Sequence, residues 1–248
     1  MPFTIDIITL APTMWECMDS GVIGRAKRAG LWTQNIWHLR DFATRADKRV
    51  DDRAYGGGPG MVIASPPLRQ CLDHVIAQHE TKPVVIQMDP AGQPLTAALA
   101  QQLAQHSALI VLCGRYEGID ARITETYVDQ SVSIGPYVLS AGDLPGMCLV
   151  DATVRLLPDV LGNALSAVQD SFADGLLDTP HYTRPESDMT GSVPPVLTGG
   201  NHADIQRWRR KMALGRTWSE QPQLLRGRSL SDEDIQLLQA YIQENSHL

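Results

Sequence analysis

Two short apolar runs constrain the fold of this chain more than any other feature. Pro83–Met88 (PVVIQM) and Ala108–Cys113 (ALIVLC) are apolar almost throughout, and each ends at a turn signal. Continuous apolar runs are typical of parallel strands that helices bury on both faces. Between them, Pro94–Gln105 is rich in Ala, Leu and Gln and is a predicted helix. Upstream, Phe3–Leu10 and Asn35–Leu39 are predicted strands, so an α/β domain is expected.

A helix is also expected between these strands and the first apolar run, where Ser65 can cap a segment that begins at Pro66 and runs toward His79. After Pro158 the sequence changes character. Residues 158–200 are rich in Gly, Pro, Asp, Ser and Thr without a sustained period, which indicates a long and often functional connection.

Three helical segments are expected near the end of the chain, close to Ala203–Leu214, Glu220–Leu225 and Ser231–Glu244. Ser231 and Asp234 resemble a capping box. We therefore predict a main domain at 1–160, a linker at 161–174 and a small helical domain at 175–248.

The net charge counts against nucleic-acid binding, but its distribution does not. Lys and Arg total 21 and Asp and Glu 28, a formal charge of −7, whereas nucleic-acid binders are usually basic. Residues 22–53, however, carry eight basic and four acidic side chains, and residues 201–228 carry seven and two. Two such patches can bind a polyanion locally, although ordinary solvated faces explain them equally well.

The cysteines Cys17, Cys71, Cys113 and Cys148 lack metal-ligand spacing, and the last three lie in apolar runs typical of reduced core thiols. The sequence shows no signal peptide and no run approaching the roughly 20 apolar residues of a membrane span. A cytoplasmic protein without a membrane segment is expected.

Four segments have the composition of a binding or catalytic site. The first, Tyr55–Met61 (YGGGPGM), exposes a backbone that can approach a phosphate or a base, and a flexible surface loop is an equally good interpretation. In Leu112–Arg122 (LCGRYEGIDAR) a buried strand ends at a possible ligand rim. There Glu117 is a candidate carboxylate, although the residues alone favour a solvated acid or a partner of Arg115.

The third segment, Ser133–Pro145 (SIGPYVLSAGDLP), predicts a tightly bent loop whose main chain suits a neutral planar ligand such as adenine. Pro145 fits the first turn of a helix that carries Asp151 and Arg155 on one face, a pair that a surface salt bridge also explains. The fourth segment, Gln169–Pro185, concentrates acids in the irregular connection. Catalytic residues often lie in loops, but the residues alone do not select among these acids.

Together with Val193–Arg209 (VPPVLTGGNHADIQRWR), these motifs resemble the motif series of the TrmD family, in its order and spacing. The resemblance extends from Asp6 to about Leu225. It implies a tRNA (guanine-N1)-methyltransferase of the SPOUT superfamily. The implied fold is α/β, with a SPOUT-type parallel sheet, a C-terminal trefoil knot and a small C-terminal helical domain.

The resemblance also implies an S-adenosylmethionine pocket. By motif position its lining is Gln87, Met88, Asp89, Gly114, Tyr116, Glu117, Ile134, Gly135, Tyr137, Leu139, Ala141, Gly142 and Pro145. Ala141 stands where the family usually has a second glycine, and Asp143 stands for Glu. These departures bear on cofactor affinity and not on the class of reaction.

The implied reaction is methyl transfer to N1 of the guanosine 3′-adjacent to the anticodon. That nitrogen carries a proton, so a general base is required, and Asp170 falls at the family's position for it. Arg155 falls at the position of the catalytic arginine that would stabilise the guanine oxygen. Glu117 is the residue that would support Mg²⁺.

The remaining expectations concern partners. The residues expected to contact tRNA are Gly57, Gly58, Gly60, Arg184, Arg207, Arg209, Arg210 and Lys211. The family resemblance implies a homodimer with its active site at the subunit interface. Two alternatives stay open at this point: a SPOUT enzyme that acts on another RNA site, and a non-catalytic RNA-binding module, although binding alone needs neither Asp170 nor Arg155.

Overall fold

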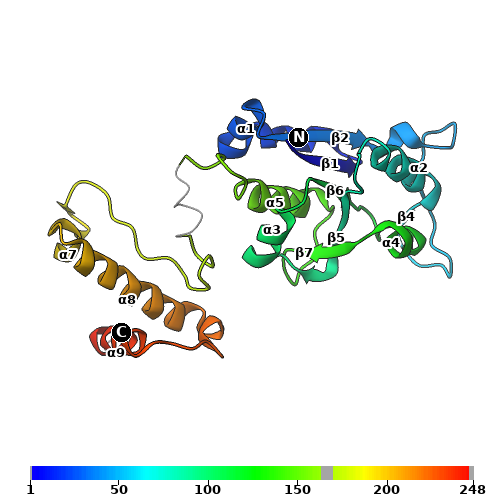
Figure 1. Cartoon of the computed structure of the whole chain (residues 1–248). Coiled ribbons are helices and arrows are strands. Elements are labelled where there is room, and N and C mark those ends of the chain that lie inside the picture. Colours follow the sequence, from blue (N-terminus) through cyan, green and yellow to red (C-terminus); the bar gives the residue numbers. More distant parts are fainter. Residues whose placement is uncertain (1, 163–169, 246–248) are drawn as a thin grey trace. The chain divides into compact units, whose positions relative to one another are not determined.

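Five parallel strands form the centre of the first of two units. The computed structural model describes residues 2–162 and 170–245, and it divides the chain into the compact units Met1–Ala164 and Leu165–Leu248. The strand order is β2-β1-β6-β5-β7 (Figure 1). The strands are β1 (Phe3–Thr9), β2 (Trp32–His38), β5 (Val84–Pro94), β6 (Ala108–Cys113) and β7 (Gln130–Ser133).

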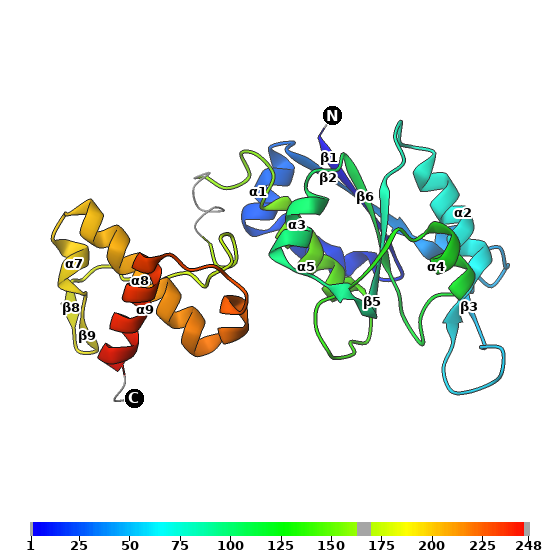
Figure 2. The same cartoon turned by 60° about the horizontal axis from the view of Figure 1, so that its bottom comes forward.

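Helices cover both faces of this sheet, as the apolar runs predict (Figure 2). Leu109 and Val111 of β6 pack into one buried cluster, and Ile110 and Leu112 pack into the other. The first face is covered by η1 (Pro12–Asp19), α1 (Gly21–Arg28), α3 (Ala97–Leu103) and α5 (Asp143–Val154). The second is covered by η2 (Leu39–Phe42), α2 (Ser65–Ile76) and α4 (Ala121–Tyr127).

One carboxylate is buried within this apolar sheet. Asp6 on β1 accepts hydrogen bonds from Asn35 Nδ2 (3.1 Å) and Trp37 Nε1 (2.7 Å), and its second oxygen lies 2.8 Å from His79 Nε2. The carboxylate therefore has partners on both oxygens, as a buried charge requires. This arrangement ties β1 to β2 and to the chain that follows α2.

Several predicted boundaries were wrong. The strand β5 does not end at DPAG, because Met88 and Gln93 both pair with Val132 and the residues between them form a bulge. A Cβ at Gly92 would lie 2.4 Å from Val132 N, so the bulge presses directly against β7. Ser65 lies inside α2 and does not cap it. The short helices α1 and α4 were not predicted.

The second unit is helical. It contains α7 (Pro195–Thr198), α8 (His202–Glu220), η3 (Pro222–Leu225) and α9 (Asp232–Asn245), and a hairpin of β8 (Ser187–Asp188) and β9 (Gly191–Ser192). Leu176, Leu214 and Leu237 form its core. A Cβ at Gly215 would lie 2.1 Å from the Tyr241 ring, so α8 and α9 pack in close contact. The Asp234 N–H donates to Ser231 Oγ (3.1 Å) at the start of α9.

The predicted linker falls partly outside the described residues, which resume at Asp170. From there the chain is bonded to the second unit, because Phe172 N–H donates to Leu176 O (2.7 Å) and Arg210 donates to Asp174 (2.9 Å). The domain bounds 1–160, 161–174 and 175–248 stay a prediction. Among the described residues, no helix is long and apolar enough to cross a membrane.

The cysteines give a test of the core. Cys71 and Cys113 are buried, whereas Cys17 and Cys148 are exposed, which corrects the interpretation of Cys148 as a core thiol. Burial raises the pKa of the Cys71 thiol to about 12 and also raises that of Cys113. Because the thiolate is the reactive form, we expect iodoacetamide at pH 8 to label Cys17 readily and to spare Cys71 and Cys113 until the chain is unfolded. Peptide mass spectrometry checks this, and equal labelling of all sites in the folded protein would contradict the packing.

Candidate functional site

A cavity of about 300 Å³ opens beside Gln87–Pro90 in the middle of β5 and beyond the ends of β6 and β7. Its place agrees with the general rule that ligands of open α/β sheets bind beyond the carboxyl ends of the strands. All thirteen residues predicted for the cofactor pocket line this cavity. They are Gln87, Met88 and Asp89 of β5, Gly114, Tyr116 and Glu117 after β6, and Ile134, Gly135, Tyr137, Leu139, Ala141, Gly142 and Pro145 after β7. That they bind the cofactor stays a prediction.

The β5 wall of the cavity is held by side-chain hydrogen bonds. Gln87 Nε2 donates to Asp89 Oδ2 (2.9 Å), and Gln87 Oε1 accepts from Thr124 Oγ1 on α4 (2.8 Å). The second Asp89 oxygen accepts from Ala91 N–H (2.8 Å), which closes the start of the β5 bulge. Gln87 is buried, and these two hydrogen bonds satisfy its amide and fix its orientation.

The two loops on the opposite side are joined through their backbones. Gly142 N–H donates to Gly114 O (2.8 Å), and Arg115 and Ala141 form an antiparallel bridge. A Cβ at position 142 would lie 2.9 Å from Gly114 N and 3.0 Å from Cys113 Cα. Only glycine fits between the loops without displacing backbone.

The glycine-rich segment Tyr55–Met61 lies against the same rim. Glu117 N–H donates to Met61 O (3.0 Å), and Ile63 N–H donates to Gly118 O (3.0 Å). Gly60 has φ +84° and touches Glu117 so closely that a Cβ there would lie 2.4 Å from Glu117 Oε1. The structure thus brings a predicted RNA-contacting loop to a predicted cofactor residue, although Gly57 and Gly58 line neither described cavity.

Asp143 is a site residue that sequence reasoning did not select. Its side chain is fully buried behind the cavity and accepts from Thr9 Oγ1 (2.5 Å) and Trp15 Nε1 (3.0 Å). Its other oxygen lies 3.7 Å from Arg115 Nη2. The carboxylate therefore fastens the start of α5 to β1 and η1. The only signal in the sequence was its departure from the family pattern.

Arg155 does not line the cavity within the first unit, and Asp170 lies in the other unit of the described chain. Arg155 closes α5 at its C-terminal end, whereas Pro145 in the first turn of α5 lines the cavity. At a rise of 1.5 Å per residue, their Cα atoms are about 15 Å apart. Asp170 belongs to the second unit, where its carbonyl accepts from Ala173 N–H (3.1 Å). Their joint role therefore stays a prediction.

Comparison with known proteins identifies the family. The family model "tRNA (Guanine-1)-methyltransferase TrmD" matches residues 3–227. This chain belongs to the TrmD family. It is 51% identical over 245 residues to a tRNA (guanine-N(1)-)-methyltransferase of Chromobacterium violaceum, covering 97% of this chain and 96% of that one. Proteins of the same name from Coxiella burnetii and Salmonella newport are 49% and 48% identical, each over at least 98% of this chain and 95% of their own length.

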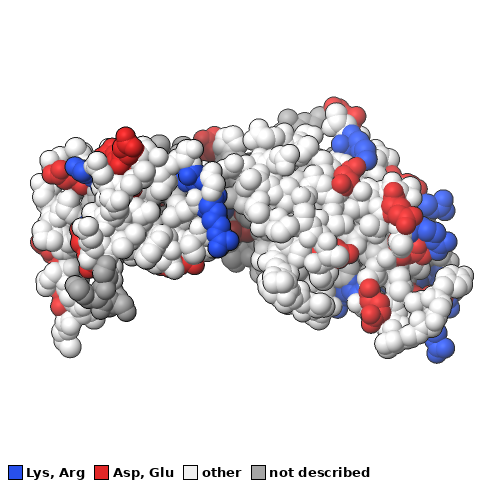
Figure 3. Space-filling model, turned by 90° about the horizontal axis from the view of Figure 1, so that it is seen from below, with Lys and Arg blue, Asp and Glu red and all other residues white. Residues whose placement is uncertain are grey.

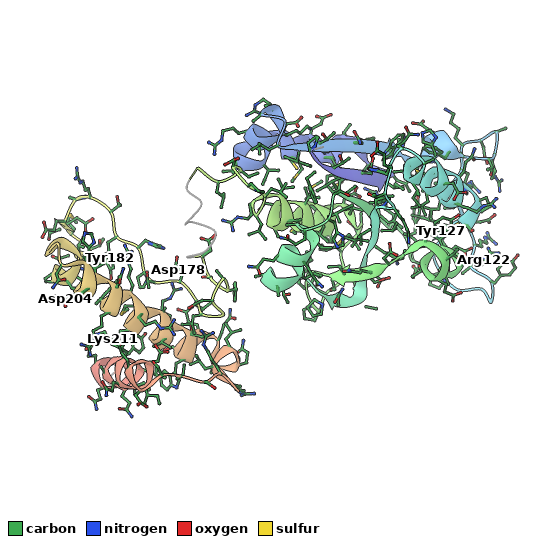
Figure 4. The ribbon with its side chains drawn as sticks, viewed as in Figure 1. Arg122, Tyr127, Asp178, Tyr182, Asp204 and Lys211 are labelled. Carbon is green, nitrogen blue, oxygen red and sulfur yellow. The ribbon has the colours of Figure 1, made fainter. Side chains whose placement is uncertain are left out.

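Most basic side chains on α8 of this TrmD chain are paired. Arg210 donates to Asp234 (2.7 and 2.8 Å), and this contact lowers the pKa of the Asp234 carboxyl. Lys211, which points toward α9 in Figure 4, donates to Glu244 (2.6 Å). Arg207 Nε lies 3.9 Å from Glu233. Their predicted contacts with tRNA phosphates would compete with these acids.

The other predicted basic patch, residues 22–53, lies partly at the edge of the first unit near β3 (Asp51–Asp52) and β4 (Val62–Ile63). Figure 3 shows Lys and Arg gathered there with acidic side chains among them. Arg45, for example, lies 3.3 Å from Asp47 and 3.6 Å from Asp52. The patch is therefore partly neutralised by its own acids.

No group of three or more His, Cys, Asp or Glu that could hold a metal occurs among the described residues of this TrmD chain. Glu117 is therefore a single carboxylate and does not belong to a cluster of metal-ligating side chains among the described residues. It stays a predicted Mg²⁺ ligand, which would need water or substrate oxygens to complete the coordination.

The contact between the loops predicts the effect of one methyl group. Gly142→Ala places a Cβ against the Gly114 backbone, so the loops must separate or shift. Overpacking of this kind costs about 1–3 kcal/mol, and we expect S-adenosylmethionine to bind about tenfold more weakly or worse by calorimetry. Gly162→Ala is the matched control, because its Cβ would meet no atom within 4 Å. Wild-type affinity in a folded Gly142→Ala protein would show that the close approach is dispensable.

Proposed function

We propose that this chain transfers a methyl group from S-adenosylmethionine to N1 of the guanosine 3′-adjacent to the anticodon of tRNA, giving 1-methylguanosine in the cytoplasm. The observation that carries the proposal is that one cavity is lined by every residue that the motifs predict for the cofactor. The names of relatives that are about half identical over nearly the whole chain support the substrate and the reaction. The SPOUT trefoil knot is part of the same proposal.

The chemistry of the cavity lining suits the proposed cofactor. Its walls combine main chain from two glycine-containing loops with apolar side chains such as Ile134 and Leu139. Such a lining suits an adenine ring that is read by backbone hydrogen bonds. When bound, S-adenosylmethionine supplies a methyl group that is activated as part of a sulfonium. The chain's own contribution is to orient that group and exclude water from it.

The acceptor requires proton removal, and Asp170 is the proposed base. The N1–H of guanine must lose its proton before a lone pair can attack, and a positioned carboxylate can accept it. The negative charge that develops then spreads to the guanine carbonyl oxygen. Arg155 is the proposed donor to that oxygen, as in an oxyanion hole. Glu117 is the proposed Mg²⁺ ligand at the rim of the cavity.

Two features support a homodimer with a shared site. Arg155 lies at the end of α5 remote from the chain's own cavity, so its guanidinium can act more readily on a neighbouring one. The cavity rim also exposes apolar side chains, with Val138 80% and Tyr137 52% exposed. Exposed apolar patches mark protein interfaces. We propose that the partner subunit covers this rim and that its Asp170 and Arg155 complete the site.

The first test concerns the base. Asp170→Asn keeps the size of the side chain but removes its basicity, so we expect methyl transfer to unmodified tRNA to fall by about 10²- to 10⁴-fold. Cofactor binding should persist, because the substitution leaves all thirteen predicted cofactor residues of the first unit unchanged. Asp204→Asn, an exposed acid of the same unit, is the control. Nucleoside analysis must identify 1-methylguanosine in the wild type, since another methylated nucleoside would refute the proposed reaction. Near-normal turnover in Asp170→Asn would remove that residue from the role.

The second test concerns the shared site. Asp170→Ala and Gly142→Val are each expected to be inactive, one for lack of the base and one for a blocked pocket. If the site is shared, a co-expressed heterodimer contains one intact pocket and one Asp170 at the same site, and activity returns to about half of the wild type. If each chain supplies both parts of its own site, every site in the heterodimer keeps one defect. An inactive purified heterodimer, or an active monomer in sedimentation, would therefore exclude the shared site.

A further inference from the structure

A second hollow lies wholly within the helical unit, between the segment 179–186 and α8, and has a volume of about 1020 Å³. We call it the α8 groove. Two aromatic rings, Tyr182 and Trp208, line it, and so do two arginines, Arg184 and Arg209. None of the residues that line the first cavity, and neither Arg155 nor Asp170, belongs to it. It is therefore a site apart from the proposed reaction centre.

The wall formed by the segment is anchored at both ends. Leu177 N–H donates to Thr217 Oγ1 on α8 (2.9 Å), and Arg216 Nη1 donates to the Asp178 carbonyl (2.7 Å). At the other end, Val193 N–H donates to the Glu186 carbonyl (2.8 Å). The groove thus has fixed walls before any ligand enters, which lowers the entropic cost of binding.

The aromatic rings in the groove retain exposed apolar surface. Their centroids are 6.3 Å apart and their planes are inclined by 58°, so the rings do not stack on one another. Tyr182, labelled in Figure 4, is 48% exposed. A planar ligand that lies against either ring would remove this surface from water.

The groove also holds two arginines that, unlike the other cations of α8, are in no ion pair between described residues. Four cations of the helix, Arg207, Arg210, Lys211 and Arg216, lie within 4 Å of acidic side chains. Among the ion pairs between described residues, none involves Arg209 or Arg184. The one acidic side chain in the groove lining is Glu186, which can accept from the amino group of a base. Unpaired guanidinium groups beside aromatic rings match a phosphate beside a nucleobase.

We propose that the α8 groove binds one unpaired nucleotide of the tRNA, other than the guanosine that is methylated. Its base lies against Tyr182 and Trp208, and its flanking phosphates contact Arg184 and Arg209. Single-stranded RNA is commonly bound by stacking on aromatic side chains together with basic groups along the backbone. The inference rests on the proposed function for its ligand, but the groove is built from residues that the reaction does not use.

The first experiment measures the stacking contribution in the full-length protein. The probe is an unmodified anticodon stem-loop RNA, with affinity measured by fluorescence anisotropy. Trp208→Leu and Tyr182→Leu should each weaken binding from about fivefold to about a hundredfold, as expected for one base stacked on one ring. Trp218→Leu is the matched control, because Trp218 lies on the same helix, is 45% exposed and does not line the groove. Equal affinities for the groove variants and this control would overturn the proposal.

The second experiment tests the exposed arginines, whose loss should not impair folding. Arg184→Gln and Arg209→Gln should each flatten the dependence of log affinity on log salt concentration by about 0.7. Arg226→Gln, an exposed cation of the same unit outside the groove, measures what loss of charge alone contributes. Wild-type slopes in both groove variants would refute the phosphate contacts even if Trp208→Leu proved unstable.

The third experiment locates the nucleotide and separates the groove from the proposed function. Stem-loops with a single abasic loop position are bound to wild type and to Trp208→Leu. At one position other than the methylated guanosine, the abasic change should weaken the wild type and have little further effect on the variant, because both remove one contact. Absence of such a position overturns the groove proposal, while 1-methylguanosine formation by the wild type leaves the proposed function intact. In the groove variants, KM should rise and kcat at saturating tRNA should persist.

Discussion

The hydrogen bond between Gly142 N–H and Gly114 O is the constraint on which the candidate site depends. It joins two loops that are distant in sequence, and the absence of a Cβ at Gly142 permits the approach. Behind it, the buried Asp143 carboxylate fastens the same loop to Thr9 and Trp15. The loops around the cavity are thus held by a backbone hydrogen bond between them and by the buried Asp143 carboxylate. This preorganisation suits a site that must orient a ligand within a fraction of an ångström.

The two units differ in where their acidic side chains lie and in what these side chains contact. The first unit buries the carboxylates of Asp6 and Asp143, and hydrogen bonds from several donors to these two groups join its strands and helices. The second unit instead pairs its acids with cations of α8, the largely buried Asp234 with Arg210 and the exposed Glu244 with Lys211. Pairs at the surface add little stability. These pairs also decide which cations remain available, and Arg184 and Arg209 of the α8 groove are among them.

The sequence predicted the sheet and the cavity lining better than it predicted details of packing. The strand β6 was predicted to the residue, because a doubly buried strand needs an unbroken apolar run. The β5 bulge could not be predicted, since Asp89 and Pro90 have the composition of a turn and only pairing with Val132 continues the strand. Every residue that the motif resemblance predicted for the pocket lines the cavity. The resemblance did not predict the role of Asp143, because its partners Thr9 and Trp15 are far away in the sequence.

The internal pairing of cations bears on how the chain distinguishes its substrate from other polyanions. A surface with many unpaired lysines and arginines binds any nucleic acid, because the release of counterions favours contact with every phosphate equally. Here the overall charge is −7 and the α8 cations outside the groove are matched by acids. If the α8 groove binds RNA as we propose, the pairing of the other α8 cations favours an RNA whose loop fits the groove over polyanions that offer only phosphates.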